Sequence, residues 1–274
     1  MKSICIGIMA AVLAATSTAT TACTNNTEEG TALRAMKIGD TEIINGESYV
    51  LTFYDDFDTD SLNTENWEYC PEWERADRGG VWSGEMVSVG DGVLKLATDF
   101  DEAESRCKSG AVRTKGIFEQ AYGWFEASIK LQQTTGFWSA FWLMTPAQGN
   151  IGNGGKDGCE IDIMEGYSFA DRMINHALHW DGYGAEHQSS GKNEQLDIYD
   201  GEFHTFALKW TKQRYYFYVD GELMWDTDDG GVSEVATYLK LTLEVGSWAG
   251  EIDKSSLPDG IEVDYVRVYQ FAEE

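Results

Sequence analysis

Three carboxylates lie close together in segment 158–166, which reads Gly-Cys-Glu-Ile-Asp-Ile-Met-Glu-Gly. In an extended strand successive side chains point to opposite faces, so Glu160 and Asp162 share one face and the two isoleucines share the other. Strict alternation would turn Glu165 into the apolar face, where an unpaired carboxylate is costly. A one-residue β-bulge near Met164 would return Glu165 to the acidic face, and bulges are frequent beside active sites.

Carboxyl groups on one strand face can perform glycoside hydrolysis. Retaining glycosidases hold two of them about 5–5.5 Å apart. One attacks the anomeric carbon, and the other protonates the leaving oxygen. The same segment could instead form a solvated acidic edge or a calcium site, and its residues alone do not choose between these interpretations.

A set of short strands must position these groups. Apolar runs recur about every 8–12 residues between glycine or Asn/Asp turns, a spacing typical of a β-sandwich rather than of βαβ units. The 274 residues, with 42% hydrophobic content, 29 Gly and 3 Pro, suit one all-β domain with a substantial core. No amphipathic helix, repeat or second domain is predicted. Strands are expected over residues 48–53, 86–89, 93–98, 109–114 and 121–132.

The strand expected over 136–144 carries four aromatic residues. Trp138 and Trp142 share one face, and Phe137 and Phe141 share the other. One face must be core. We expect the two tryptophans to face a cleft, because aromatic rings stack on sugars and the acidic strand follows.

The segment Glu-Ile-Asp-Ile-Met-Glu resembles the signature of glycoside hydrolase family 16, in the form that carries an extra residue. The similarity extends over about residues 49–270. It implies a concanavalin A-like β-jelly-roll sandwich of two antiparallel sheets, with an open substrate cleft on the concave face. Further matching segments are 109–115, 122–131, 136–143, 203–210, 217–221 and 263–269.

This resemblance assigns roles to the three carboxylates. Glu160 would be the nucleophile, Glu165 the general acid/base, and Asp162 the residue that holds the geometry and charge of the nucleophile. Three close carboxylates cannot all ionise without cost, so one of them should have a raised pKa and keep its proton near neutrality.

The resemblance also implies a retaining, endo-acting enzyme on a β-linked polysaccharide. A β-1,3- or mixed β-1,3-1,4-glucan is the first choice. Ser139 stands where the glucan-cleaving branch usually has proline, so β-galactans, including agar-type and mucin O-glycan chains, are the alternative. A non-catalytic, lectin-like module would be a different class of function, because fold does not imply chemistry.

Other residues are expected to bind substrate. Loop 73–82 is rich in sugar-binding residue types and contributes Arg78 and Trp82. His176 and His179, three apart on a strand, should face opposite sides and not share a metal. The resemblance places His179 in the cleft near the acid/base. Trp180 opens a turn that also contains Tyr183 and could add an aromatic wall.

The N-terminal residues predict export. Residues 1–22 are typical of a secretion signal, with Lys2 before an apolar run too short to span a bilayer. Thr20-Thr21-Ala22-Cys23 resembles a lipobox, with Thr20 where an aliphatic residue is usual. We therefore expect a cell-surface or outer-membrane lipoprotein anchored at Cys23, or else a secreted protein. Residues 23–47 would be a tether, in which residues 31–47 are a linker or an ill-defined first strand, and residues 48–272 would be a single catalytic domain.

Charge restricts the partners. A net charge of −27 argues against nucleic acid and disfavours polyanionic substrates unless a local basic patch overrides it. The expected protein is a monomer that binds a neutral polysaccharide, touches a membrane only through the lipid anchor, and needs no cofactor for catalysis. The resemblance implies a structural calcium site near Asp56, Gly92 and Asp264.

Five cysteines do not make a disulfide framework. Cys5 lies in the leader and Cys23 in the lipobox, so three remain in the domain and at least one is unpaired. A bridge between Cys70 and Cys107 is left open. Cys159, beside Glu160, is expected to be a small buried residue, because no matching base is evident.

Overall fold

The computed structural model describes residues 36–75 and 79–272. The predicted leader, the lipobox Cys23 and Arg78 lie outside the described residues. Within the described ranges, no helix has the length and apolar character needed to cross a membrane.

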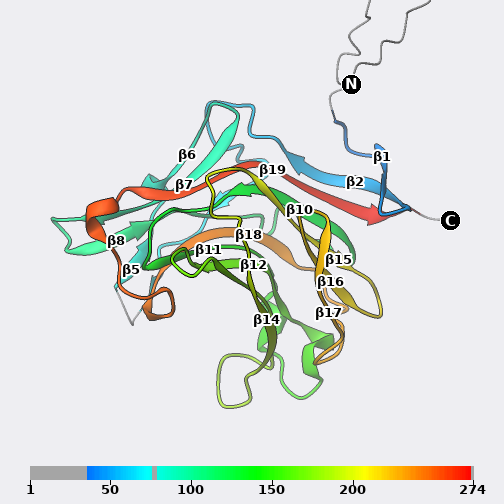
Figure 1. The fold of residues 1–274 in the computed structure, drawn as a ribbon. Coiled ribbons are helices and arrows are strands. Elements are labelled where there is room, and N and C mark those ends of the chain that lie inside the picture. Colours follow the sequence, from blue (N-terminus) through cyan, green and yellow to red (C-terminus); the bar gives the residue numbers. More distant parts are fainter. Residues whose placement is uncertain (1–35, 76–78, 273–274) are drawn as a thin grey trace, which may run out of the picture. The chain divides into compact units, whose positions relative to one another are not determined.

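The described strands form two sheets that pack face to face (Figure 1). One sheet has seven strands. In spatial order these are β14 (Gln188–Gln195), β13 (Met173–Trp180), β12 (Glu160–Ser168), β11 (Phe137–Met144), β18 (Tyr238–Val245), β9 (Ala111–Arg113) and β3 (Glu68–Tyr69).

The second sheet has twelve strands. Its main path is β17 (Glu222–Thr227), β16 (Tyr215–Val219), β15 (His204–Trp210), β10 (Gly123–Lys130), β19 (Asp259–Phe271), β7 (Val93–Asp101), β8 (Arg106–Ser109), β5 (Gly80–Trp82) and β4 (Glu74–Arg75). Off this path, β2 (Glu47–Asp55) pairs with β19, β1 (Thr41–Ile44) with β2, and β6 (Val87–Gly90) with β7.

Among the described strands, pairing is antiparallel except between β5 and β8, which run parallel. The helical elements of the described residues are single 3₁₀ turns: η1 (Gly84–Met86), η2 (Pro146–Gly149), η3 (Gly154–Asp157), η4 (Ser247–Ala249) and η5 (Lys254–Ser256). The prediction of a two-sheet all-β sandwich is confirmed.

Alternation along the central strands separates the core from the cleft. On β18, Leu239, Leu241 and Leu243 are fully buried in the core between the sheets. Burying such a side chain contributes about 1.5–3 kcal/mol. The intervening residues of β18 therefore point to the other face of the seven-stranded sheet, where the cleft lies.

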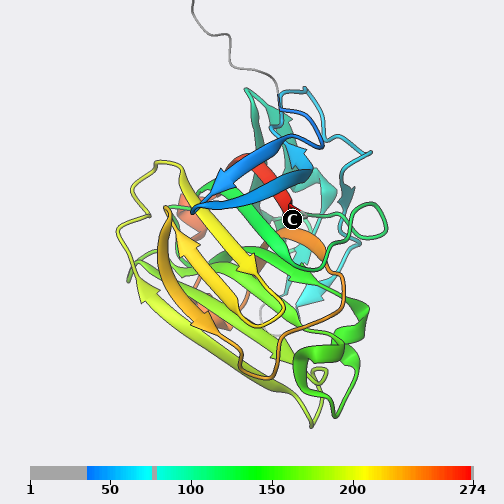
Figure 2. The same cartoon turned by 90° about the vertical axis from the view of Figure 1, so that its right-hand side faces the viewer.

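Of the two alternatives left open for residues 31–47, a linker or an ill-defined first strand, the structure has a strand over residues 41–44. There β1 and β2 form a hairpin beside β19 (Figure 1, Figure 2). The turn residues Asn45 and Gly46 have φ of 51° and 82°, as a two-residue hairpin loop requires. The four residues of β1 are mostly exposed, so they lack the apolar alternation on which the prediction relied.

Candidate active site

The acidic strand β12 contains the predicted bulge. Opposite it on β11, Phe141 pairs with Met164 and Trp142 pairs with Asp162, which leaves Ile163 as the extra residue. The register with β13 shifts at the same place. Ile163 and Met164 are both buried in the core, and Glu165 returns to the cleft face. The bulge prediction is confirmed.

A buried histidine satisfies the backbone of this bulge. His176 on β13 is fully buried, and its Nδ1 lies 2.6 Å from the carbonyl oxygen of Ile163. Burial lowers the pKa of His176 to about 4, so the ring is neutral near pH 7. Since a carbonyl only accepts, Nδ1–H must be the donor. His176 therefore faces the sandwich and stabilises the backbone turn that aims Glu165.

The cleft is a hollow of about 590 Å³ on the face of the seven-stranded sheet that is turned away from the core. Glu160 and Asp162 are only 8% and 4% exposed, which excludes a solvated acidic edge. The residues that line the cleft are Trp73, Arg75, Trp82, Trp138, Ala140, Trp142, Met144, Glu160, Asp162, Glu165, Tyr183, Lys240 and Glu244.

Trp138 and Trp142 line this cleft, while Phe137 and Phe141 are buried in the core. The predicted choice of faces on β11 is confirmed. Trp82 lines the cleft as well, with its Nε1 donating to the carbonyl of Leu243 at 3.1 Å. Contact of these rings with a sugar stays a prediction.

Glu160 begins β12 and is held from the loop after β13. The hydroxyl of Tyr183 donates to Glu160 Oε2. Withdrawal of the hydroxyl from water and the neighbouring Glu160 carboxylate raise the pKa of Tyr183, so the hydroxyl keeps its proton. Tyr183, which belongs to the turn expected to add an aromatic wall but was not itself among the predicted site residues, thus contacts the predicted nucleophile.

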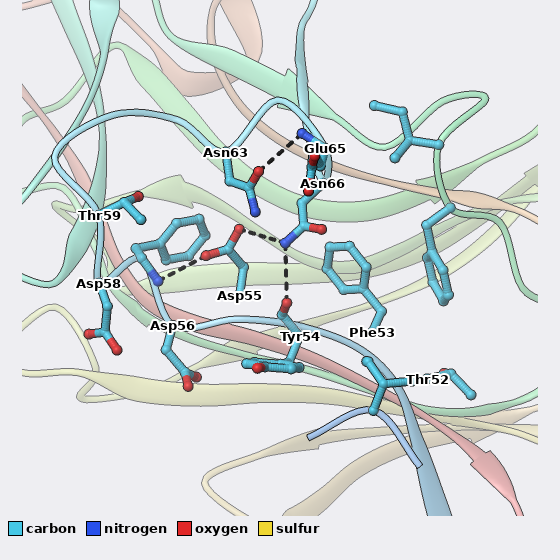
Figure 3. A pocket seen from close by; sticks show the side chains of 14 residues that line it. Thr52, Phe53, Tyr54, Asp55, Asp56, Asp58, Thr59, Asn63, Glu65 and Asn66 are labelled. Carbon is cyan, nitrogen blue, oxygen red and sulfur yellow. Dashed lines mark hydrogen bonds between the residues drawn. The ribbon is translucent and has the colours of Figure 1, made fainter. Parts of the chain in front are cut away.

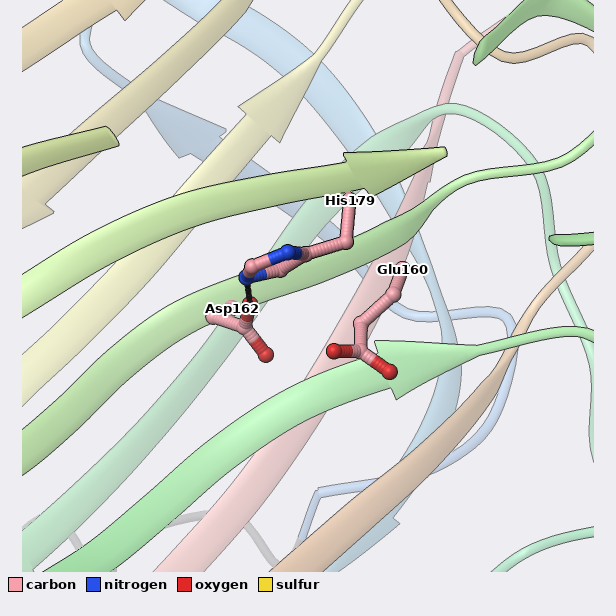
Figure 4. A group of neighbouring side chains, drawn as sticks. All are labelled: Glu160, Asp162 and His179. Carbon is pink, nitrogen blue, oxygen red and sulfur yellow. Dashed lines mark ion pairs between the residues drawn. The ribbon is translucent and has the colours of Figure 1, made fainter. Parts of the chain in front are cut away.

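Asp162 and His179 face each other beside Glu160 (Figure 4). His179 Nε2 lies 3.5 Å from Asp162 Oδ2, and His179 Nδ1 lies 3.0 Å from Nε2 of His187. Burial, with His187 adding to it, lowers the pKa of His179 to about 4. Ligand atoms of Glu160, Asp162 and His179 lie within 4.8 Å of one another, so these three residues could hold a metal ion.

Glu165 has a different environment from Glu160. Its Oε2 accepts a hydrogen bond of 3.1 Å from Nδ2 of Asn175, its partner on β13. Sequence reasoning did not select Asn175, because counting along β13 does not tell which residue of β12 it faces. The shift of register at the bulge brings Asn175 opposite Glu165.

Removal from water raises the pKa of all three carboxyl groups. The pKa of Glu160 rises to about 7 and that of Glu165 to about 8, in each case chiefly through burial. Burial also raises the pKa of Asp162 well above its usual range, and the charges of Glu160 and Glu165 add to this. One ionised and one protonated glutamate can therefore coexist near neutral pH, as a nucleophile and acid pair requires.

A family model for glycosyl hydrolases family 16 matches residues 75–267. The chain belongs to glycoside hydrolase family 16. This family assignment covers β12 and its bulge, both flanking strands, and most of the sandwich.

Similar family members act on different glycans. A keratan-sulfate endo-1,4-beta-galactosidase of Sphingobacterium multivorum is 28% identical over 250 residues, and the match spans 84% of this chain but only 58% of that relative. A beta-glucanase of Rhodothermus marinus is 27% identical over 252 residues, spanning 81% of this chain and 86% of the relative.

Solved family 16 structures share the fold. A non-specific endo-beta-1,3(4)-glucanase has a TM-score of 0.71 and 27% identity, covering 85% of this chain and 95% of its own. A Bacteroides ovatus family 16 protein of a mixed-linkage glucan locus, in complex with an oligosaccharide product, has a TM-score of 0.67 and 25% identity. The match covers 79% of this chain and 99% of that protein's chain.

Two predicted binding residues of this family 16 chain lie elsewhere than expected. Trp180 is 9% exposed and packs in the core against Gly230, so its prediction as a cleft residue is wrong. The reason is strand parity, because His179 takes the cleft side and its neighbour must point inward. His179 was expected near Glu165 but lies beside Asp162, opposite Glu160 in the register of β12 and β13.

Three charged cleft residues were not among the predicted site residues. Arg75 Nε donates to Glu244 Oε2 at 2.9 Å, Nη2 forms an ion pair with the same oxygen at 2.8 Å, and the guanidinium lies 4.6 Å from the centre of the Trp138 ring. A Cβ at Gly246 would lie 2.8 Å from Arg75 Cδ, so the position of Arg75 in the cleft requires glycine at residue 246. Lys240 and Glu244 come from β18, whose alternating sequence Tyr-Leu-Lys-Leu-Thr-Leu-Glu-Val was the signal that could have identified them.

A second hollow, of about 550 Å³, lies at the end of β2 (Figure 3). Two of its acidic residues, Asp55 and Asp56, are engaged within the protein. Asp55 Oδ2 accepts from Asn66 and from Trp67, both at 3.0 Å, and Asp56 Oδ1 accepts from Arg267 at 3.1 Å. Gly92 and Asp264 do not line this hollow, so the calcium site expected near Asp56, Gly92 and Asp264 stays a prediction.

The three cysteines of the described domain are free and buried. Cys70 and Cys107 do not form the bridge that was left open. Burial raises the pKa of Cys70 to about 11 and that of Cys159 well above its usual value, so neither is an activated thiolate. Cys159 is the small buried residue that was expected.

The pH dependence of kcat/KM should be bell-shaped. Activity should fall below about pH 7, as Glu160 takes up a proton, and above about pH 8, as Glu165 loses one.

In Tyr183→Phe the carboxylate of Glu160 loses a donor that lowers its pKa, so the acid limb should move to higher pH and kcat/KM should drop about tenfold. Initial rates from pH 5 to 10 measure the bell-shaped profile of the wild type and the shift in the variant. An acid limb that does not move in Tyr183→Phe would contradict the assignment of that limb to Glu160.

Proposed function

We propose that the protein is a retaining endo-β-glycosidase that hydrolyses internal linkages of a β-1,3- or mixed β-1,3-1,4-glucan. The observation that carries this proposal is the bulged strand β12, which puts Glu160, Asp162 and Glu165 together in a cleft lined by tryptophans. The Rhodothermus marinus beta-glucanase and the endo-beta-1,3(4)-glucanase structure support the choice of substrate.

The proposed reaction is a double displacement. In the first step the ionised Glu160 carboxylate forms a bond to the anomeric carbon, the glycosidic C–O bond breaks, and Glu165 gives its proton to the leaving oxygen. In the second step Glu165 takes a proton from water, whose oxygen attacks the same carbon and releases Glu160. Two inversions retain the β configuration, and the chemistry needs no cofactor.

Asp162 would act through charge and position. It lies between the two glutamates in sequence and shares their face, and its high pKa follows from burial beside both. His179 and Asp162 together limit where the Glu160 carboxyl group can move. This role makes Asp162 a positioning residue of the proposed mechanism.

Product analysis on a panel tests the proposal. Protein lacking residues 1–30 is incubated with laminarin, barley β-glucan, agarose, a neutral galactan and mucin glycans, beside Glu160→Gln. We expect oligosaccharides from a glucan that are absent with the variant. Release only from galactan or mucin would keep the mechanism and replace the substrate, in line with the keratan-sulfate relative. Binding without release from any glycan would favour a lectin.

We also propose that the protein is exported and anchored through a lipid on Cys23, and that it acts as a monomer. The support is the lipobox-like sequence before Cys23. Expressed in a Gram-negative host, the full chain should partition into the detergent phase of Triton X-114, and Cys23→Ala should not. Equal partitioning of the two would contradict the anchor.

The structural calcium near Asp56, Gly92 and Asp264 is likewise a proposal. Its support is topological: Asp264 lies on β19 between the segment that pairs with β7 and the segment that pairs with β2. Gly92 precedes β7 and Asp56 follows β2, so the chain brings the three to one region of the sheet. A thermal midpoint that chelator does not lower would count against it.

A further inference from the structure

Lys240 is a charged residue of the cleft that the proposed mechanism does not use. It lies on β18, where Lys240, Thr242 and Glu244 alternate with the three core leucines. Its side chain is buried, with 6% of the residue exposed, and it lines the cleft. Lysine is rarely buried to this degree without a partner.

The contacts of the Lys240 ammonium are aromatic. Its Nζ lies 3.7 Å from the ring centre of Trp142 and 4.4 Å from that of Trp82. Within residues 36–75 and 79–272, no hydrogen-bond acceptor or ion-pair partner contacts it. Cation–π contacts offset part of the cost of burying a charge, but they leave the three N–H donors without an acceptor among the described residues. Arg75, by contrast, is paired with Glu244.

Beside Lys240 the cleft is lined by a small side chain. Ala140 lies between Trp138 and Trp142 on β11 and lines the cleft with them. Lys240 pairs with Trp142 across the strands, and Ala140 pairs with Thr242. A pyranose ring over Ala140 would therefore have an indole on either side along β11 and the ammonium at its edge.

We propose that Lys240 is a specificity-determining residue that donates charge-assisted hydrogen bonds to a hydroxyl oxygen of a neutral sugar in this part of the cleft. The proposal rests on the proposed function, because it assumes that the cleft binds a glycan. The sugar concerned lies on the β18 side of the carboxylates, where the tryptophans are gathered.

Local charge favours a neutral sugar over a sulfated or carboxylated one. Among the described residues that line the cleft, the cations are Arg75 and Lys240, and the acids are Glu160, Asp162, Glu165 and Glu244. An anionic substituent that reached Lys240 would meet Glu160 and Glu244, whose charges act on this lysine. A hydroxyl accepts the same hydrogen bond without that repulsion.

The test compares Lys240→Met, Lys240→Arg and the wild type. Methionine keeps an unbranched stem between Trp82 and Trp142 but has no donor, whereas arginine keeps charge and donors. We expect kcat/KM for laminarin or barley β-glucan to fall about 10- to 100-fold in Lys240→Met and less in Lys240→Arg. In a Glu160→Gln background, the affinity for the same polysaccharide should fall by a similar factor.

Lys115→Met is the matched control. Lys115 Nζ also contacts an aromatic ring of β18, 5.7 Å from the centre of Tyr238, but Lys115 does not line the cleft. Its kcat/KM should equal that of the wild type. Circular dichroism and the unfolding midpoint report folding, and if Lys240→Met does not fold, Lys240→Gln takes its place.

The outcomes separate this inference from the proposed function. Unchanged kcat/KM and affinity in Lys240→Met, with an active wild type, would overturn the role of Lys240 alone. A wild-type preference for sulfated laminarin over laminarin that disappears in Lys240→Met would overturn the assignment to a neutral sugar. A wild type that neither cleaves nor binds any polysaccharide would overturn both.

Discussion

Glu160→Ala should reduce hydrolysis of the polysaccharide substrate by at least about 10⁴-fold, equivalent to about 5.4 kcal/mol of transition-state stabilisation. The proposed glycosyl-enzyme bond forms only to the Glu160 carboxylate. Among the described cleft residues, no other carboxyl group accepts the hydrogen bond from Tyr183 and could take the place of Glu160. Reducing-end release over hours measures the residual rate. Glu222→Ala, an exposed change at the start of β17 in the other sheet, should keep full activity.

Azide supplies a second readout for Glu160→Ala. The substitution leaves a space where a small anion can attack the anomeric carbon of an activated aryl β-glycoside. A single displacement then inverts the configuration and gives an α-glycosyl azide. Formation of that product would identify Glu160 as the nucleophile, and wild-type activity in Glu160→Ala without azide would contradict the assignment.

Glu165→Gln should lower kcat on polysaccharide by about 10²–10⁴-fold, the range for loss of a general acid or base. Glutamine fills the same space and can still contact Asn175, so the change removes the proton and little else. A sugar leaving group needs that proton. A 2,4-dinitrophenyl leaving group does not, so its first bond cleavage should remain fast.

Pre-steady-state kinetics distinguish these steps. With the dinitrophenyl substrate, Glu165→Gln should give a burst of phenolate and accumulate the glycosyl-enzyme, because water attack lacks its base. The alkaline limb of the pH profile, which falls above about pH 8 in the wild type as Glu165 ionises, should disappear. Equal losses on both substrates, with the alkaline limb intact, would assign Glu165 another role.

Sequence reasoning could predict the acidic strand because side-chain parity depends only on neighbouring residues of the same strand. The parity of Glu160, Asp162 and Glu165 conflicts with burial unless a residue is inserted, and the structure inserts Ile163. Alternation put Trp138 and Trp142 on one face, and the tendency of aromatic rings to stack on sugars selected that face for the cleft. Trp180 was mispredicted because its ring type was weighed above strand parity, which turns it to the face opposite that of its neighbour His179.

Elements that lack an apolar face could not be predicted in this way. β14 has the sequence Gln-Ser-Ser-Gly-Lys-Asn-Glu-Gln and pairs only with β13 among the described strands, so it is a polar edge strand. β1 is similar, and only its Asn-Gly turn marked it. Propensity and periodicity carry little information about such edges, since their pairing depends on the neighbouring strand.

The contacts that complete the cleft are long-range. Arg75 and Glu244 are 169 residues apart, and no spacing rule links β4 to β18. Asn175 reaches Glu165 only because the bulge shifts the register between β12 and β13. The sequence therefore indicated the residues of the reaction more completely than the residues that bind and position the sugar.

The configuration of the first product tests the double displacement most directly. Cleavage of barley β-glucan or laminarin is followed by proton NMR from the first minutes, before mutarotation. The proposed mechanism predicts that the β-anomer of the new reducing end appears first and the α-anomer grows in later. Initial release of the α-anomer would show a single inverting displacement and contradict the roles assigned to Glu160 and Glu165.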